Sequence, residues 1–532
     1  MNPHETYPGT AFLPAWFGAG ALVAVLSFFG VEAPTDKVGE DGQPPTASPT
    51  KETTVERLTI PSIHGLAGFP ASMWDEPFQF AEHERIDKLD EESELAHLLR
   101  SKLNRGPQQK LMLLFVTAPS EANLLETQRR RRHAVELALA NQDFSLAYPD
   151  RMSYRRVEYE FHHSARGVSL KPRDGESKET RCKTPLVETR AVALPTKLYE
   201  RNDDGSLILI TWVPDQCLGQ RPISTLRCLL RDLREFHQQA AFCFLGPSWS
   251  NNLSTLIKDA SKCSPEEAKA ITDWKYGSVL CNSLCTAPDG RLGISSDKEK
   301  FIPLGSERPL KDDAQPESTK QWKLIHTIGS DERLIDVLQH ELDIRGVWPS
   351  PSSSSNMVLF AEQGATTYVE SLQNSLQQVG ESAPLIVIPY LKGIAAGQID
   401  HEGKTLVTGD AYVEDYLDRS LVELKAPSSF RSIKPNAVRL VGLIGSRWED
   451  KNLILQKARK VFPVATFFTT ELDARYSLPD CIGHTRNLIV ASHYGLTVSG
   501  QNGVFPKIAD TPAFRDGYQT SIFVGASVLC HA

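Results

Sequence analysis

The sequence predicts an α/β protein of two lobes, each built on a doubly wound parallel sheet, after an amino-terminal transmembrane helix and a disordered tether. Three observations predict this organisation. One uncharged apolar run lies near the amino terminus, short apolar runs then alternate with helical patterns, and that alternation starts a second time near residue 323. The 532 residues leave room for two large lobes, since domains typically contain about 100–200 residues.

The amino-terminal run covers residues 11–31, which carry no charge and are mostly apolar. At about 1.5 Å per residue, a helix of this length crosses a hydrocarbon core of about 30 Å. Two alternatives stay open. A cleaved signal peptide would need a basic start, and the tail at residues 1–10 contains neither Lys nor Arg. A buried core helix fits poorly with the polar, Pro-rich stretch that follows, so we expect an uncleaved membrane helix.

Residues 32–107 are expected to form a tether and linker between the membrane and the body. Residues 33–54 are rich in Pro, Thr, Gly and charged side chains. Such a composition buries too little apolar surface to offset the entropy that ordering would cost.

The first alternating series predicts a first lobe over residues 108–330. Residues 110–120 form a continuous apolar run, which is typical of a strand buried on both faces. The further elements expected in this lobe are helices at 121–141, 223–237 and 253–260, and strands at 207–213 and 241–245.

The second series predicts a second lobe over residues 331–532. Strands that alternate with helices indicate βαβ units and therefore parallel sheets with right-handed crossovers. After a strand at 323–328, the expected helices are 331–345, 367–379, 450–462 and 514–530, and the expected strands are 357–360, 385–389, 438–444, 465–469 and 487–492.

Composition narrows the function classes. The apolar fraction of 40% and the charged fraction of 23% are ordinary for a folded protein, and the net charge is −8. An acidic chain is a poor nucleic-acid binder, because that affinity comes mainly from neutralising phosphates. Nine cysteines are too few for a disulfide scaffold, and we expect them to act as small buried apolar side chains.

Enzyme motifs are missing. The chain contains neither a G-x-S-x-G elbow nor an H-E-x-x-H zinc motif. Gly403–Thr405 lacks the spacing of a phosphate-binding loop, and Gly442–Gly445 lacks the third glycine of a dinucleotide site. We therefore predict a protein that is not an enzyme, with no catalytic residue, no metal site and no cofactor.

The densest basic cluster, Arg129–Arg132, lies in a predicted helix. Four consecutive side chains fan around a helix, so we interpret them as a solvated surface. Contact with a phosphate or another acidic ligand is the alternative.

Two segments place hydroxyl groups and free N–H groups at the start of a helix that follows a strand. They are Gly246–Ser250 and Thr327–Asp331. A helix amino terminus favours an anion or a carboxylate, and ligands of doubly wound sheets bind at the carboxyl ends of strands. Ordinary helix capping by Ser250, Ser330 or Asp331 is the alternative reading.

The order of these segments over residues 108–530 resembles the type I periplasmic-binding-protein family, which includes branched-chain amino-acid receptors. The matching segments are Gly246–Ser250, Ser330-Asp331, Leu359–Glu362 and Phe514–Thr520. The resemblance implies two lobes around a ligand cleft. The ligand-binding residues expected from the motifs and the resemblance are Ser248, Ser250, Ser330, Asp331, Glu362, Asp473, Arg475 and Tyr518.

The carboxyl-terminal region also resembles an uncharacterised group of bacterial membrane-associated proteins, in segments Phe467–Arg475, Thr485–Ser492 and Arg515–Thr520. We predict a membrane-anchored, non-enzymatic binding or sensor protein that takes a small-molecule ligand. The alternative is a structural component of a bacterial membrane assembly that contacts protein partners through a degenerate cleft. We expect a single span in the bacterial inner membrane and a periplasmic body, although Lys37 and Lys51 favour the cytoplasmic side.

Overall fold

The computed structural model describes twelve parts of the chain. They are residues 92–103, 109–119, 125–148, 153–162, 187–285, 300–303, 321–348, 356–363, 385–394, 415–422, 434–498 and 511–531 without 512. The expected membrane helix at 11–31, the helix at 367–379 and Gly403–Thr405 lie outside these residues, and so do residues 32–91 and 104–107 of the expected tether and linker. Residues 92–103 of that expected linker form a helix whose Leu99 and Leu103 are buried in the core of the first lobe, so this part is not a linker. None of the described helices is long and apolar enough to span a membrane.

The first lobe contains a nine-stranded sheet whose centre is parallel. The central strands are β1 (Leu111–Ala118), β5 (Leu207–Pro214), β6 (Ala240–Leu245), β7 (Ser278–Asn282) and β9 (Gln321–His326), in the spatial order β5-β1-β6-β7-β9. Every residue of β5 is buried, as a continuous apolar run requires. The antiparallel additions are β2 (Phe144–Leu146), β3 (Ser153–His162), β4 (Val187–Arg201) and β8 (Lys300–Pro303).

Helices cover both faces of this sheet. The helices that pack on one face are α3 (Glu92–Leu103), α6 (Pro222–Arg231), α7 (Ser250–Ala260) and α8 (Pro265–Thr272), together with the short α5 (Asp215–Leu218). The other face buries α4 (Leu125–Ala140) and α14 (Gly517–His531). This two-sided covering is the reason that the central strands are apolar on both faces.

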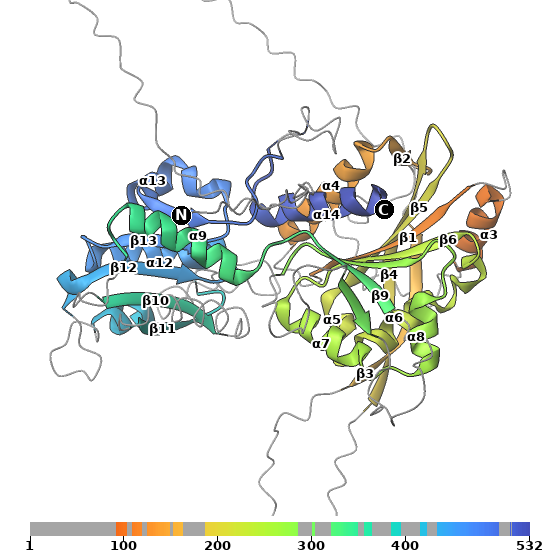
Figure 1. The fold of residues 1–532 in the computed structure, drawn as a ribbon, viewed down its shortest axis with the longest axis horizontal. Coiled ribbons are helices and arrows are strands. Elements are labelled where there is room, and N and C mark those ends of the chain that lie inside the picture. Colours follow the sequence, from red (N-terminus) through yellow and green to blue (C-terminus); the bar gives the residue numbers. More distant parts are fainter. Residues whose placement is uncertain are drawn as a thin grey trace, which may run out of the picture.

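Within the described residues, the sheet of the second lobe has five strands, and all of them are parallel. Its strands are β10 (Asn356–Gln363), β11 (Leu385–Leu391), β12 (Val438–Ile444), β13 (Thr466–Thr470) and β14 (Leu488–Ala491), in the order β11-β10-β12-β13-β14. Helix α12 (Trp448–Val461) packs on one face and α9 (Asp331–Ile344) on the other, and α13 (Pro479–Thr485) follows β13. The predicted fold of two doubly wound lobes is confirmed (Figure 1).

The two parallel cores share one winding order. In each, the first strand has the second on one side and the remaining three on the other. The winding therefore reverses between β1 and β6 in the first lobe and between β10 and β12 in the second. Ligands of such sheets bind outside the carboxyl ends of the strands at these switch points.

The chain crosses between the lobes more than once. It leaves the first lobe after β9, builds the second sheet, and returns after β14 to place α14 beside α4 (Figure 1). Helix α14 falls in the range predicted as the second lobe, yet it packs on the first sheet. The side chains of α14 are apolar on almost every face. Such a helix is stable when it is buried on several sides, and α14 packs against α4, β6 and β7.

Three further observations bear on the sequence expectations. The prediction that Arg129–Arg132 form a solvated surface is wrong for Arg131 and Arg132, which are each 7% exposed. The hairpin of β3 and β4 was not predicted from the sequence. Of the eight described cysteines, none forms a disulfide with another and six are buried, as expected for small apolar side chains.

Candidate ligand-binding cleft between the lobes

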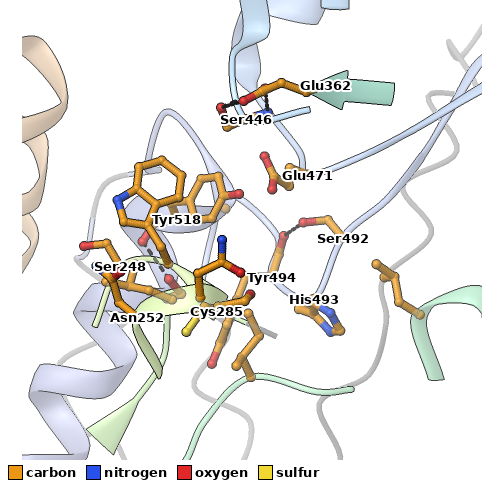
Figure 2. A pocket seen from close by; sticks show the side chains of 18 of the residues that line it. Ser248, Asn252, Cys285, Glu362, Ser446, Glu471, Ser492, His493, Tyr494 and Tyr518 are labelled. Atoms are coloured by element: carbon orange, nitrogen blue, oxygen red, sulfur yellow. Dashed lines mark hydrogen bonds between the residues drawn. The ribbon is translucent and has the colours of Figure 1, made fainter. Parts of the chain in front are cut away.

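A cavity of about 330 Å³ lies between the lobes, within the range of about 300–1,000 Å³ that is usual for ligand pockets. The first lobe contributes Ser248–Asn252, Leu284, Cys285 and Ile328. The second lobe contributes Leu334, Glu362, Gln363, Lys392, Ser446, Glu471 and Ala491, and the crossing segments and α14 add Ser492–Tyr494, Gly517, Tyr518 and Ser521. Figure 2 shows Glu362, Ser446 and Glu471 on one side of the cavity, and Ser248, Asn252 and Cys285 on the other.

The first wall begins where β6 ends, at the switch point of the first sheet. Gly246 has φ +146°, and a Cβ there would lie 2.4 Å from the Thr117 Oγ1 atom. Glycine is therefore required, both by the backbone conformation and by the close approach of β1. The tight turn brings the Ser248 Oγ atom within 3.2 Å of Thr117 Oγ1.

A buried ion pair supports Ser248 from behind. The Arg131 Nη1 atom donates to Ser248 Oγ at 2.5 Å and lies 3.9 Å from Asp215 Oδ2. The Ser248 backbone N–H donates to Asp215 Oδ1 at 3.2 Å. Burial raises the pKa of Asp215 although Arg131 opposes that shift, and burial lowers the pKa of Arg131 although Asp215 opposes it. The charge of each group therefore stabilises the ionised form of the other in the protein interior.

Helix α7 starts at the cavity. Trp249 is its N-cap residue and supplies no side-chain hydrogen bond to the first turn. Ser250, Asn251 and Asn252 of that first turn line the cavity. The wall therefore combines hydroxyl and amide side chains with the positive end of a helix, which suits a hydrogen-bond acceptor or an anion.

The second wall begins at the matching switch point, between β10 and β12. Gly445 follows β12, and a Cβ there would lie 1.7 Å from the Tyr390 hydroxyl oxygen. The next residue, Ser446, donates its backbone N–H to Glu362 Oε2 at 2.6 Å and its hydroxyl to Glu362 Oε1 at 3.0 Å. Glu362 is 4% exposed, so these two bonds hold the carboxylate in place.

A second carboxyl group, Glu471, follows β13. Its backbone has φ +73°, an uncommon value for a residue with a side chain. Burial raises the pKa of Glu471 to about 8, against the opposing effect of Lys451, whose Nζ atom lies 3.7 Å away. At neutral pH this side chain is largely protonated, and it can donate a hydrogen bond to a ligand through its hydroxyl and accept one at its carbonyl oxygen.

The crossing segments form another part of the lining. The Tyr494 hydroxyl donates to the Thr327 carbonyl oxygen, which joins the segment after β14 to the segment after β9. A Cβ on Gly329 would lie 3.0 Å from His493 Nδ1, so the two segments also approach closely there. Burial, with a smaller effect of Arg333, lowers the pKa of His493 to about 4, so its ring is neutral at physiological pH.

Four of the predicted ligand-binding residues line the cavity, namely Ser248, Ser250, Glu362 and Tyr518. The structure places the other four elsewhere. Ser330 caps α9 by accepting a hydrogen bond from the Arg333 N–H, and Asp331 beside it is fully buried. Ser250 is the first residue of α7 and does not cap it.

Asp473 and Arg475 join the second lobe to the last crossing. The Arg475 side chain donates to Asp473 Oδ2 at 2.8 Å and to Glu449 Oε1 at 2.7 Å. Asp473 forms a β-bridge with Asp516, and Asp516 accepts from Arg130 of the first lobe at 2.5 Å. This pair therefore supports the connection between the lobes.

Sequence reasoning missed Ser446, Glu471 and Lys392. All three follow a parallel strand of the structure directly or within two residues. Their place at the carboxyl ends of strands was the available signal. We overlooked it because none of the three belongs to a recognisable motif.

No family model matches the chain, and no curated protein matches it. Solved structures are similar to it at low identity. One is the branched-chain amino acid transporter substrate binding protein LivJ from Streptococcus pneumoniae in complex with isoleucine, at 10% identity and a TM-score of 0.40 over 80% of this chain and 84% of that chain. Another is the leucine binding protein LivK from Thermotoga maritima, at 8% identity and a TM-score of 0.39 over 79% of this chain and 82% of that chain.

A solute binding protein of an ABC transporter from R. palustris in complex with benzoate is similar at 10% identity, with a TM-score of 0.39 over 79% of each chain. The predicted likeness to binding proteins of the branched-chain amino-acid receptor kind is thus found among solved structures. Sequence identities and TM-scores this low assign neither a ligand nor an activity to this chain. The resemblance to an uncharacterised bacterial group stays a prediction.

Proposed function

We propose that the protein binds a small molecule in the cavity between its lobes and does not transform it. The observation that carries the proposal is the position of the cavity. It lies at the carboxyl ends of the strands in both sheets and is lined by residues next to both switch points, where ligands of such sheets bind.

The chemistry of the walls supports a ligand with two unlike ends. The first lobe offers hydroxyl and amide groups at the start of α7, whereas the second lobe offers Glu362 and Glu471. Leu284, Ile328 and Leu334 lie among them and favour an apolar body. A small compound with an acceptor at one end and a donor or cation at the other fits these groups.

The lining residues also support binding without catalysis. Among the described lining residues, no serine–histidine or cysteine–histidine pair is present, and the Ser446 hydroxyl is hydrogen-bonded to the Glu362 carboxylate, which is itself held by the Ser446 backbone N–H. Ser248 accepts from an arginine, and burial raises the pKa of the Cys285 thiol well above its usual range. His493 makes no hydrogen bond to a serine or cysteine of the described wall, and its Nε2 atom is buried without a partner there.

A thermal-shift screen of the full chain against amino acids, short carboxylic acids and small amines tests the proposal. A ligand at about 100 times its Kd adds about 2.7 kcal/mol to the free energy of unfolding. We expect at least one compound to raise the midpoint of wild type and of Glu266→Gln, a control on a side chain that is 89% exposed. Ser250→Trp should abolish that shift, because the larger side chain occupies the cavity. If no compound shifts the wild type, or Ser250→Trp responds equally, the cleft does not bind these ligands.

We further propose that the binding body is tethered to a bacterial inner membrane, on the periplasmic side, where closure of the lobes would report the ligand to a partner. This proposal rests on the uncharged apolar residues 11–31. The full chain should stay with membranes during alkaline carbonate extraction, whereas a chain starting at residue 55 should be released. External protease should cut the body in spheroplasts. Protection of the body would place it in the cytoplasm instead.

A further inference from the structure

Lys392 and Trp249 face each other from different lobes at the cleft. Lys392 directly follows β11 of the second lobe, and Trp249 precedes α7 of the first. The Lys392 Nζ atom lies 4.7 Å from the centroid of the Trp249 ring. Both residues line the cavity, and both are exposed to solvent, Trp249 at 37%. They therefore meet where the cavity reaches the surface.

From this contact we propose that Lys392 and Trp249 form a latch that closes the mouth of the cleft and regulates access to it. The inference rests on the proposed function, because a latch regulates binding only if the cleft binds a ligand. The contact itself joins the lobes whether or not a ligand is present.

Hydrogen bonds of the backbone hold the segments that carry Lys392 and Trp249. The Gly393 N–H donates to Asp450 Oδ2 at 2.7 Å, which ties the turn after β11 to the start of α12. Gly393 has φ +83°, which favours glycine at this turn. On the other side, the Trp249 carbonyl accepts from the N–H groups of Asn252 and Leu253, at 3.0 and 3.1 Å. These backbone hydrogen bonds tie each side of the contact to its own lobe, so the contact depends on the relative position of the two lobes.

The charged groups around the cavity favour the contact between Lys392 and the Trp249 ring. It is the one lysine or arginine among the described residues that line the cavity. No ion pair of Lys392 with a described carboxylate is present, and tryptophan is the ring that attracts a cation most strongly. The Tyr494 hydroxyl bonds the Thr327 carbonyl and joins the crossing segments, and a turn of the lobes about these segments that opens the mouth would break the latch.

The free energy of a single cation–π contact is small enough for a reversible closure of the cleft. A cation over an exposed ring favours the closed arrangement by about two- to fivefold. Such a bias is small enough for a ligand with unequal affinity for the open and closed states to shift the populations.

Acrylamide quenching of Trp249 in the full chain without ligand tests the latch. The Trp249 signal is the difference between each variant and the same variant carrying Trp249→Phe. Lys392→Met removes the charge and keeps the length, and Lys392→Arg keeps a cation. Lys258→Met is the matched control, since Lys258 is an exposed lysine on α7 outside the cavity.

We expect Lys392→Met to increase the quenching of Trp249, and we expect Lys392→Arg and Lys258→Met to match the wild type. The latch is overturned if Lys392→Met equals Lys258→Met, or if Lys392→Arg is as accessible as Lys392→Met, because then the cation does not hold the ring. The quenching experiment contains no ligand, so a negative quenching result does not change the thermal-shift result for the cleft. A thermal-shift screen in which no compound raises the midpoint does not change the quenching result either.

Discussion

The two lobes share one winding order but differ in what stands at the switch point. In the first lobe, Ser248 faces Thr117 and accepts a hydrogen bond from a buried arginine. In the second lobe, Ser446 donates two hydrogen bonds to Glu362. The two switch points therefore present a hydroxyl backed by a cation in one lobe and a carboxylate in the other.

The difference teaches that the polarity of the cleft comes from side chains around and behind its walls, and not from the topology of the sheets. In the first lobe the cation, Arg131, stands behind the wall, with Asp215 beside it. In the second lobe the carboxyl groups of Glu362 and Glu471 line the cavity, and the buried Lys451 stands behind Glu471. A ligand would lie between a wall that favours acceptors and a wall that favours donors.

The largest expected effect comes from breaking the ion pair of the first lobe. Arg131→Met should reduce the free energy of unfolding by about 3–5 kcal/mol at pH 7, because it leaves the Asp215 carboxylate buried without a cation. Urea unfolding of the full chain measures it. Part of the loss should be recovered at pH 5, because burial has already raised the pKa of Asp215 and protonation removes the unpaired charge.

Arg129→Met on the same helix is the control, since Arg129 is exposed and its loss should cost no more than about 0.5 kcal/mol. Adding Asp215→Asn to Arg131→Met should restore much of the stability. Equal losses for the two arginine variants would mean that the pair contributes nothing and that the first wall is not organised by Arg131.

The parallel cores could be predicted from sequence, and the reason is physical. Strands buried on both faces, such as β5 and β12, require long apolar runs that stand out from their surroundings. The edge strand β3, with the sequence SYRRVEYEFH, carries no such run. The neighbour of α14 could not be predicted either, because a helix that is apolar on most faces does not indicate which sheet it covers.

For the candidate cavity, position after a strand was a partial signal: it indicated some lining residues and also some residues that lie elsewhere. Ser248 was nominated because its segment follows a predicted strand and opens a helix, and Glu362 was nominated through the resemblance to the binding-protein family; both line the cavity. Arg131 was misread as solvated, because its burial depends on Asp215 and Ser248, which lie far away in sequence. Asp473 and Arg475 also follow a strand, but the return of the chain at Asp516 turns them towards the crossing.

The second effect concerns Glu471, whose folded-state pKa is raised from 4.5 to about 8. A carboxyl group with a raised pKa binds its proton more tightly in the folded state, so its contribution to stability is full below pH 4.5 and is lost as pH rises through 8. Glu471→Gln keeps the neutral form. We expect the variant to match wild type near pH 4.5 and to be more stable by about 2 kcal/mol at pH 8, which allows for the 22% exposure of the side chain.

Unfolding curves of both proteins between pH 4.5 and pH 8.5 measure this difference, and Glu266→Gln on the surface should show none of it. A difference that does not change with pH would show that Glu471 is ionised throughout. Glu471 would then add a negative charge to the second wall throughout this range, and the contrast between the two walls would be larger.

The smallest effect tests how firmly the two lobes are joined. Tyr494→Phe removes the hydrogen bond from the Tyr494 hydroxyl to the Thr327 carbonyl between the crossing segments. Tyr416→Phe removes a bond of the same chemistry, from the Tyr416 hydroxyl to the Pro389 carbonyl at 3.1 Å, within the second lobe. The first should cost about 1 kcal/mol, because it leaves a part-buried carbonyl without its partner, and the second less, because water reaches Tyr416, which is 40% exposed. Only Tyr494→Phe should also speed amide hydrogen exchange in the crossing segments 327–330 and 492–496. If both variants leave that exchange unchanged, the lobes are joined mainly by the packing of α14 on the first sheet and by the contacts of Asp516, and the Tyr494 bond adds no restraint to their motion.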